Sequence, residues 1–189
     1  QTYLANVAGK SNHQGRNYFY RGGRCLRKTR LAIKKADTTV MNSEPLSSAE
    51  ISRIITSACE SRDYAFVVRS GHKIGAAVLT TDGEVFGGCN TEAYITGLGT
   101  CAERSAVDHA VAHGKYNFRA VATVDSELTY PCGACLQYLL QFYQISGKDI
   151  SVIVADLAGN SEIKSLTECL PYGYLTKSNL EKLKGYKSV

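Results

Sequence analysis

Residues 74–88 read IGAAVLTTDGEVFGG, a stretch with the pattern of a β-hairpin. The run 74–80 is short and apolar, Asp82-Gly83 is a strong turn signal, and 84–88 has the length and composition of the returning strand. The elements expected on either side of this hairpin indicate the class of fold.

A capping-box pattern, Ser47-Ser48-Ala49-Glu50, is followed by isoleucines at helical spacing and predicts a helix from about 48 to 62. Further helices are expected near 101–114 and 132–144, and in the polar tail from about 179. Strands are expected over 118–124 and 149–157, then a turn at 158–160, a short strand and a helical turn near 166–170. This order predicts an α/β layered domain with a mixed sheet.

Length and composition exclude several classes of protein. With 189 residues the chain can form one compact domain, and 44% hydrophobic with 21% charged residues is globular usage. No apolar run approaches the roughly 20 residues of a membrane span, and no apolar signal peptide opens the sequence. Seven cysteines, an odd number, favour a reducing, cytoplasmic setting with thiols free or bound to metal.

The charged residues are distributed unevenly along the chain. Residues 1–42 contain nine Lys/Arg and one acid, a balance of +8, whereas 43–189 contain 13 bases and 16 acids, a balance of −3. We therefore expect a basic N-terminal extension (1–45) and a slightly acidic domain (46–189). The extension has three possible roles. It could pack on an acidic surface of its own or of a neighbouring subunit, which is the usual role of a run of charges. It could instead bind nucleic acid, or it could direct the protein to an organelle.

Three cysteines occupy positions that suit a metal. Cys101 opens one predicted helix, and Cys132 and Cys135 open another, where N–H groups and the helix dipole stabilise thiolates. Three thiolates leave the fourth position of a tetrahedral zinc ion open, and Glu103 on the same helical turn as Cys101 can move protons there. The alternative, a structural zinc site, needs a fourth ligand that no motif supplies.

Cys-Ala-Glu at 101–103 followed by Pro-Cys-Gly-Ala-Cys at 131–135 resembles the cytidine deaminase family over about residues 47–185. The resemblance is to the short-chain, three-cysteine, homotetrameric type. It implies a three-layer α/β/α sandwich with a mixed five-stranded sheet, one Zn²⁺ per subunit and a zinc catalytic domain at 46–189. It also implies a small-molecule nucleoside substrate, while the lack of an apolar span predicts no membrane association.

The resemblance also implies roles around the metal. Cys101, Cys132 and Cys135 would ligate zinc, and Glu103 would move protons between water and the base. Arg104 would donate to a ligating sulfur, which offsets the negative charge of three thiolates on one zinc ion.

On the substrate side, Asn90 and Glu92 match the family's Asn-x-Glu and would hold a sugar hydroxyl. The backbone of Ala102 would help to read the edge of the pyrimidine. His72 stands where a base-stacking phenylalanine is usual, and it is expected to contact the base or to be a simple loop histidine.

Departures from the family pattern fall in this substrate pocket. His72 is one, Ala93 replaces an asparagine, and Tyr130 replaces a small hydroxyl residue before Pro-Cys. Because these changes leave the cysteines and Glu103 untouched, they bear on the choice of nucleoside more than on the chemistry.

The resulting expectation is hydrolytic deamination of cytidine or 2′-deoxycytidine to uridine or 2′-deoxyuridine plus ammonia, in pyrimidine salvage. One alternative keeps the chemistry but acts on RNA or single-stranded DNA docked through the basic extension, or on a modified cytosine nucleoside. Another is a catalytically silent zinc-binding or assembly protein, against which an intact Glu103 argues.

Overall fold

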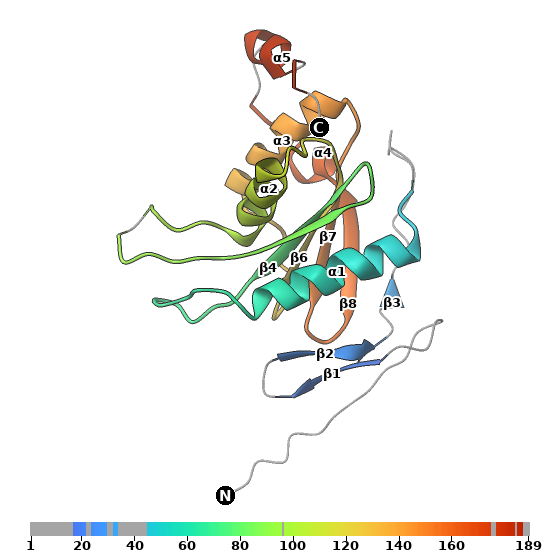
Figure 1. Ribbon diagram of the computed structural model, residues 1–189, viewed down its shortest axis with the longest axis vertical. Helices are drawn as coiled ribbons and strands as arrows, with labels where there is room; N and C mark the ends of the chain where they lie inside the picture. The colour runs from blue at the N-terminus through green and yellow to red at the C-terminus, as the bar shows by residue number, and fades with distance from the viewer. Residues whose placement is uncertain are drawn as a thin grey trace, which may run out of the picture.

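The main sheet has six strands, and the predicted hairpin supplies the two strands at one end of it (Figure 1). The computed structural model describes residues 17–21, 24–29, 32–33, 45–95, 97–174, 177–183 and 185–186. In sheet order β3-β8-β7-β6-β4-β5, the strands are Ala32–Ile33, Asn160–Ser165, Ser151–Asp156, Phe118–Asp125, Gly75–Thr80 and Val85–Cys89. The helices are α1 (Ser48–Arg62), α2 (Ala102–Ala112), α3 (Gly133–Ser146), α4 (Leu166–Cys169) and α5 (Lys177–Leu183).

Alternating residues of the central strands bury both faces of this sheet. On β4, Ala76 and Val78 pack in the cluster that includes α2 and α3, whereas Ala77 and Leu79 pack in the cluster that includes α1. All six residues of β4 are buried, as expected for a strand covered on both sides. Figure 1 shows α1 crossing in front of the strands. The three-layer α/β/α prediction is confirmed, with five strands contributed by residues 75–165.

The hairpin itself forms as predicted. β4 and β5 pair antiparallel, with Gly75 opposite Cys89 and Leu79 opposite Val85. At Gly88 the backbone of α2 approaches so closely that an added Cβ would lie 2.3 Å from the Ala106 nitrogen. A glycine is therefore required where α2 packs on β5.

The first helix begins at the predicted capping box. Ser47 Oγ accepts from the Glu50 amide, and the Glu50 carboxylate accepts in return from the Ser47 amide, at 2.8 Å. The Ser47 amide is the leading cause that lowers the pKa of Glu50, and Arg119 also pairs with this carboxylate. The backbone N–H groups of Ser47 and Glu50, which have no partner within the helix, are thereby paired at the N-terminus of α1.

Part of the basic extension forms strands, which the sequence patterns do not predict. β1 (Asn17–Arg21) pairs antiparallel with β2 (Arg24–Thr29), and β3 pairs parallel with β8. The main sheet therefore gains a short sixth strand at its β8 edge. Most of the extension lies outside the described residues, so the three interpretations of its role stay predictions.

Two further expectations concern membranes and thiols. Among the described residues, no helix has the length and apolar character needed to cross a membrane. Cys59 is disulfide-bonded, which corrects the expectation that every thiol is free or metal-bound. Cys59 lies on α1 and is buried between that helix and the sheet, in a different core cluster from Cys135, and the metal-site cysteines are free.

Candidate functional site

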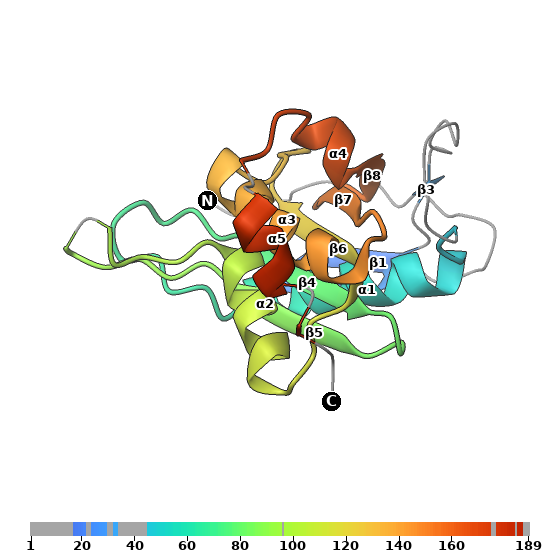
Figure 2. The ribbon, with the colours of Figure 1, turned by 90° about the horizontal axis from the view of Figure 1, so that it is seen from above.

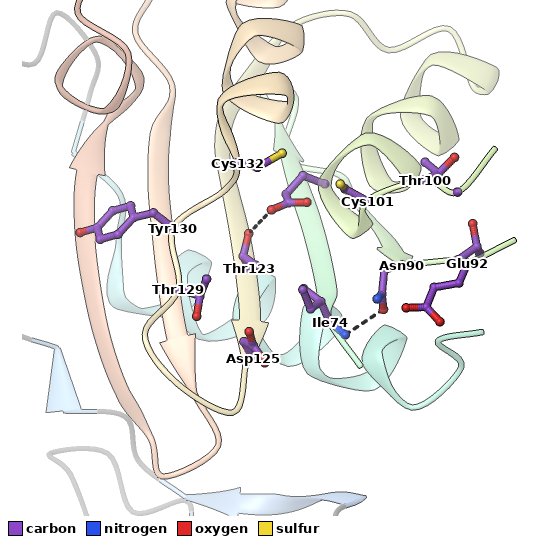
Figure 3. A pocket seen from close by; sticks show the side chains of 13 residues that line it. Ile74, Asn90, Glu92, Thr100, Cys101, Thr123, Asp125, Thr129, Tyr130 and Cys132 are labelled. Atoms are coloured by element: carbon purple, nitrogen blue, oxygen red, sulfur yellow. Dashed lines mark hydrogen bonds between the residues drawn. The ribbon is translucent and has the colours of Figure 1, made fainter. Parts of the chain in front are cut away.

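A pocket of about 300 Å³ opens where α2 and α3 begin beside the carboxyl end of β6. Its walls come from Ile74, the segments 90–92 and 99–101, Glu103, Thr123 and Asp125 on β6, and Thr129, Tyr130 and Cys132 before α3 (Figure 3). In open α/β sheets, ligands bind in a crevice outside the carboxyl ends of the strands, at the point where the order of the strands reverses. Around this pocket, the loop 63–74 and the two described parts of the next loop, 90–95 and 97–100, project from the body in both ribbon views (Figures 1 and 2).

Three sulfur atoms converge at one end of the pocket. Cys101 and Cys132 are the N-cap residues of α2 and α3, and neither side chain is used to cap its helix. With Cys135, one turn into α3, their Sγ atoms lie within 4.8 Å of one another, and Cys132 and Cys135 are 3.5 Å apart. A tetrahedral zinc ion with Zn–S bonds of about 2.3 Å would separate its sulfurs by about 3.8 Å. This geometry brings together the three predicted ligands.

Glu103 lies beside the sulfurs and is 5% exposed. Its Oε2 is 3.4 Å from Cys135 Sγ, and Thr123 Oγ1 donates to Oε1 at 3.5 Å. Thr123 therefore orients one carboxylate oxygen while the other faces the sulfur cluster. A carboxylate held in this way can take and return a proton next to a metal.

The electrostatics of the cluster fit a cation. Burial raises the pKa of the Cys135 thiol far above its usual range, and burial likewise raises that of Cys101. At Cys132 burial is outweighed by the Cys135 and Ala134 amides, which lower the pKa. Three thiolates this close together, one of them buried, are thus unfavourable without a positive partner, and zinc supplies it.

Arg104 adds a second positive group on α2. Desolvation opposes its charge, but hydrogen bonding to Cys101 and the nearby thiols raise the pKa of the guanidinium. Its Nε is buried without a hydrogen-bond partner among the described atoms. The guanidinium therefore supplies positive charge next to the cysteine cluster, as a thiolate-rich metal site requires.

Asn90 and Glu92 lie on the pocket wall, but their polar atoms bond the neighbouring loop. Asn90 Oδ1 accepts from the Ile74 amide at 2.8 Å, and its Nδ2 donates to the His72 carbonyl at 2.9 Å. The Glu92 carboxylate accepts from the hydroxyl of Ser70 and from the amides of Arg69 and Ser70, and these bonds lower its pKa. Both side chains therefore hold the loop that covers this side of the pocket.

The remaining sequence-predicted residues take different positions. Ala102 is fully buried in the core cluster, next to Cys101 and Glu103 on the pocket wall. His72 does not line the pocket, but its Nε2 lies 3.0 Å from Asp125 Oδ2. Tyr130 does line it, and its hydroxyl donates to Glu162 at 3.1 Å, which together with burial raises its pKa.

Thr123, Asp125 and Thr129 are pocket residues that the sequence reasoning missed. The available signal was that two polar residues, Thr123 and Asp125, occur two apart at the end of a strand that is apolar from Ala120 onward. That spacing places both side chains on one face of β6.

An open three-cysteine cluster with a buried glutamate at the mouth of a three-layer α/β fold defines a metal-dependent hydrolase. The model of the family described as "Cytidine and deoxycytidylate deaminase zinc-binding region" matches residues 48–147. A cytidine deaminase of Sporosarcina psychrophila is 35% identical over 133 residues, which is 69% of this chain and 95% of the relative. The chain belongs to the cytidine deaminase family.

A solved structure and a more distant relative extend the comparison. The crystal structure of cytidine deaminase from Burkholderia pseudomallei has 34% identity and a TM-score of 0.60, covering 65% of this chain and 98% of that one. A blasticidin-S deaminase of Bacillus cereus is 26% identical over 113 residues, covering 54% of this chain and 77% of the relative. The catalytic part of this chain is thus similar to nearly the whole length of the cytidine deaminases named here.

Proposed function

We propose that this protein is a zinc-dependent deaminase that hydrolyses cytidine or 2′-deoxycytidine to uridine or 2′-deoxyuridine plus ammonia. The observation that carries the proposal is the placement of Glu103 Oε2 3.4 Å from one of three clustered cysteine sulfurs inside a nucleoside-sized pocket. Pyrimidine salvage is the metabolic role that this reaction supports.

In the proposed mechanism, Cys101, Cys132 and Cys135 hold zinc, which when bound supplies an activated water as the nucleophile. At C4 a C–O bond forms and the C–N bond breaks, so that ammonia leaves. Glu103 takes a proton at its carboxylate and delivers it to the base, while Thr123 keeps Oε1 oriented. The charge on Arg104 offsets that of the thiolates.

The substrate side of the pocket supports a free nucleoside. Asn90 and Glu92 line the pocket and would hold a sugar hydroxyl while they fix the 69–74 loop, and Ala102 would place its peptide at the edge of the base. The pocket lining contains three carboxylates (Glu92, Glu103 and Asp125) and, among the described residues, no Lys, Arg or His. A phosphate-bearing substrate such as RNA or single-stranded DNA would meet like charge there, which argues against that alternative.

A modified cytosine nucleoside is a second candidate, favoured by a specific observation. Tyr130 lines the pocket where the family pattern has a small hydroxyl residue, and Lys164 lies 4.7 Å from the centroid of its ring. His72, at the usual phenylalanine position, turns its ring nitrogen to Asp125. Because one relative is a blasticidin-S deaminase, blasticidin S belongs among the substrates to be tested.

Assembly and location complete the proposal. The two projecting loops carry exposed large apolar side chains, namely Tyr64, Phe66, Val68, Tyr94, Ile95 and Leu98. Apolar patches of this kind mark protein interfaces, which supports a homotetramer whose subunits meet near the pocket. We place the enzyme in the cytoplasm, where the three ligand cysteines stay reduced, and the disulfide at Cys59 is then an exception among its thiols; residues 46–189 form the catalytic domain.

Ammonia release from a nucleoside panel tests the proposed function. Zinc-loaded protein is assayed with cytidine, 2′-deoxycytidine, 5-methylcytidine and blasticidin S, alongside Glu103→Gln. The amide cannot accept and return the proton, so we expect Glu103→Gln to bind zinc normally and to lose roughly 10²- to 10⁴-fold in rate.

Asp108→Asn is the matched control, because Asp108 lies on the same helix with its carboxylate bonded to Tyr138 outside the pocket. It should retain the wild-type rate. A near-normal rate in Glu103→Gln would refute the proton-transfer role. Failure of the zinc-loaded wild type to release ammonia from any member of the panel would refute the proposed function itself.

A further inference from the structure

The C-terminal part of α2 carries two exposed histidines that the proposed mechanism does not use. His109 and His113 are four residues apart, so their rings are neighbours on one face of the helix. Along the helix axis they are about 12 and 18 Å from Cys101, which begins the same helix. Any ligand that these two rings bind is therefore separate from the cysteine cluster.

One nitrogen of each ring is paired with a backbone carbonyl. His109 Nδ1 is 2.9 Å from the Gly87 oxygen on β5, and His113 Nδ1 is 2.8 Å from the His109 oxygen. Because a carbonyl oxygen can only accept, both Nδ1 atoms carry a proton. In a neutral imidazole, Nε2 then has the free lone pair that binds a metal. Histidines that ligate metals usually have their other nitrogen paired in this way.

The spacing of the two rings suits one shared ion. The centroids of the His109 and His113 rings are 5.0 Å apart. An ion bound by both Nε2 atoms at about 2.1 Å would lie about 3.2 Å from each centroid, and angles of about 90–109° at the ion would separate the centroids by about 4.5–5.2 Å. The observed separation falls within this range.

The surroundings of the pair hold the rings in place and favour a cation. The ring of Phe86 on β5 packs against both, with its centroid 5.3 Å from that of His109 and 5.2 Å from that of His113. His113 is the C-cap of α2, where unpaired carbonyls form the negative end of the helix dipole. Within the described part of the chain, the pair belongs to no cluster of three or more ligand groups, so water would complete the coordination.

We propose that His109 and His113 form a second metal site, which binds one divalent transition-metal ion with a preference for imidazole, such as Zn²⁺, Ni²⁺ or Cu²⁺. Two neutral nitrogens hold such an ion less tightly than the three thiolates of the cysteine cluster, so the ion at this site is exchangeable. It joins the last two turns of α2 and, through His109, connects them to β5. The site is independent of the reaction in the pocket.

Titration of the zinc-loaded chain with Ni²⁺ tests for the second site, because metal analysis distinguishes Ni²⁺ from the zinc held by the cysteines. Calorimetry at about pH 8, where ordinary imidazoles are neutral, should find one bound Ni²⁺ per chain. His109→Gln and His113→Gln should each weaken this binding by at least roughly tenfold, since a single imidazole lacks the advantage of a second ligand on the same chain. The zinc content should stay constant throughout the titration.

His72→Gln is the matched control. It removes an exposed histidine whose Nε2 is already paired with Asp125, and it should bind Ni²⁺ as the wild type does. Paramagnetic Ni²⁺ gives a second readout that needs no variant. It should broaden the imidazole NMR signals of His109 and His113 before those of the other two of the four histidines. Melting temperatures confirm that each variant is folded.

Three results would overturn the second site. The first is a wild type that binds no Ni²⁺, or binds it no more tightly than His109→Gln and His113→Gln do. The second is Ni²⁺ uptake matched by an equal loss of zinc, which would place the ion in the cysteine cluster. The third is simultaneous broadening of all four histidine signals in the wild type.

Discussion

Replacement of Gly88 by alanine should push α2, the helix that carries Glu103, away from strand β5. An added Cβ at Gly88 lies 2.3 Å from the Ala106 nitrogen and 2.8 Å from the Ala106 Cα, both of which are backbone atoms of α2. Since non-bonded heavy atoms rest about 3.5 Å apart, α2 must retreat from β5 by about 1 Å. A helix backbone cannot give way as a flexible side chain does.

The displacement should have both a stability effect and a metal effect. Overpacking of this kind costs about 3 kcal/mol, which lowers the melting temperature of a chain of this size by about 6–12 °C. The same helix carries Cys101 and Glu103, whereas Cys132 and Cys135 lie on α3. Because metal–ligand distances tolerate only about 0.2 Å, a shift of about 1 Å should weaken zinc binding as well.

Thermal unfolding, zinc content after dialysis and ammonia release from cytidine measure these effects together. Gly185→Ala is the control, because its Cβ would make only an ordinary contact of 3.4 Å with the Lys182 carbonyl. The control should match the wild type in all three measurements. If Gly88→Ala melts within about 2 °C of the wild type and keeps its zinc, the close approach of α2 to β5 is wrong.

Two other predictions concern the ligands and the first helix. Cys132→Ala should lose both zinc and activity. Cys169→Ala removes a half-buried free thiol outside the cluster and should keep its zinc, as measured by metal analysis. A fully metallated and active Cys132→Ala would contradict the assignment of Cys132 as a ligand. Glu50→Gln should lower the melting temperature by about 2–4 °C at neutral pH. The Ser47 amide lowers the pKa of Glu50 in the folded protein. The stabilisation that the Glu50 carboxylate provides is therefore complete above its unfolded pKa of about 4.3 and is lost as the pH falls through its folded pKa. A difference in melting temperature between wild type and Glu50→Gln that stays constant down to about pH 3 would contradict this prediction.

The regular elements of the catalytic part were predictable because each carries a local signal. The capping box at Ser47 begins α1, and the Asp82-Gly83 turn joins β4 to β5, as expected from the sequence. The cysteines that open α2 and α3 were predicted to form one site from the Cys-Ala-Glu and Pro-Cys-Gly-Ala-Cys motifs, and their sulfur atoms do cluster. Periodicity and capping act over a few residues and are written in the chain itself.

The pocket wall was less predictable, for a physical reason. His72 and Asp125 meet across 53 positions, and Glu92 meets the Ser70 amide across 22, through loops whose conformation no period describes. The strands of the N-terminal extension escaped prediction for a related reason. β3 has two residues, and its ladder partner Asn160 lies far along the chain.

The pairing of β3 with β8 has a consequence for any shortened form of the protein. Removal of residues 1–45, the obvious way to ask what the basic extension does, also strips a strand from the main sheet. The uncovered β8 backbone would then present unpaired N–H and C=O groups, a template for edge-to-edge association between molecules. Aggregation of such a truncated form would thus report a bare sheet edge rather than a lost function, so a cut that retains Ala32 and Ile33 is the better probe.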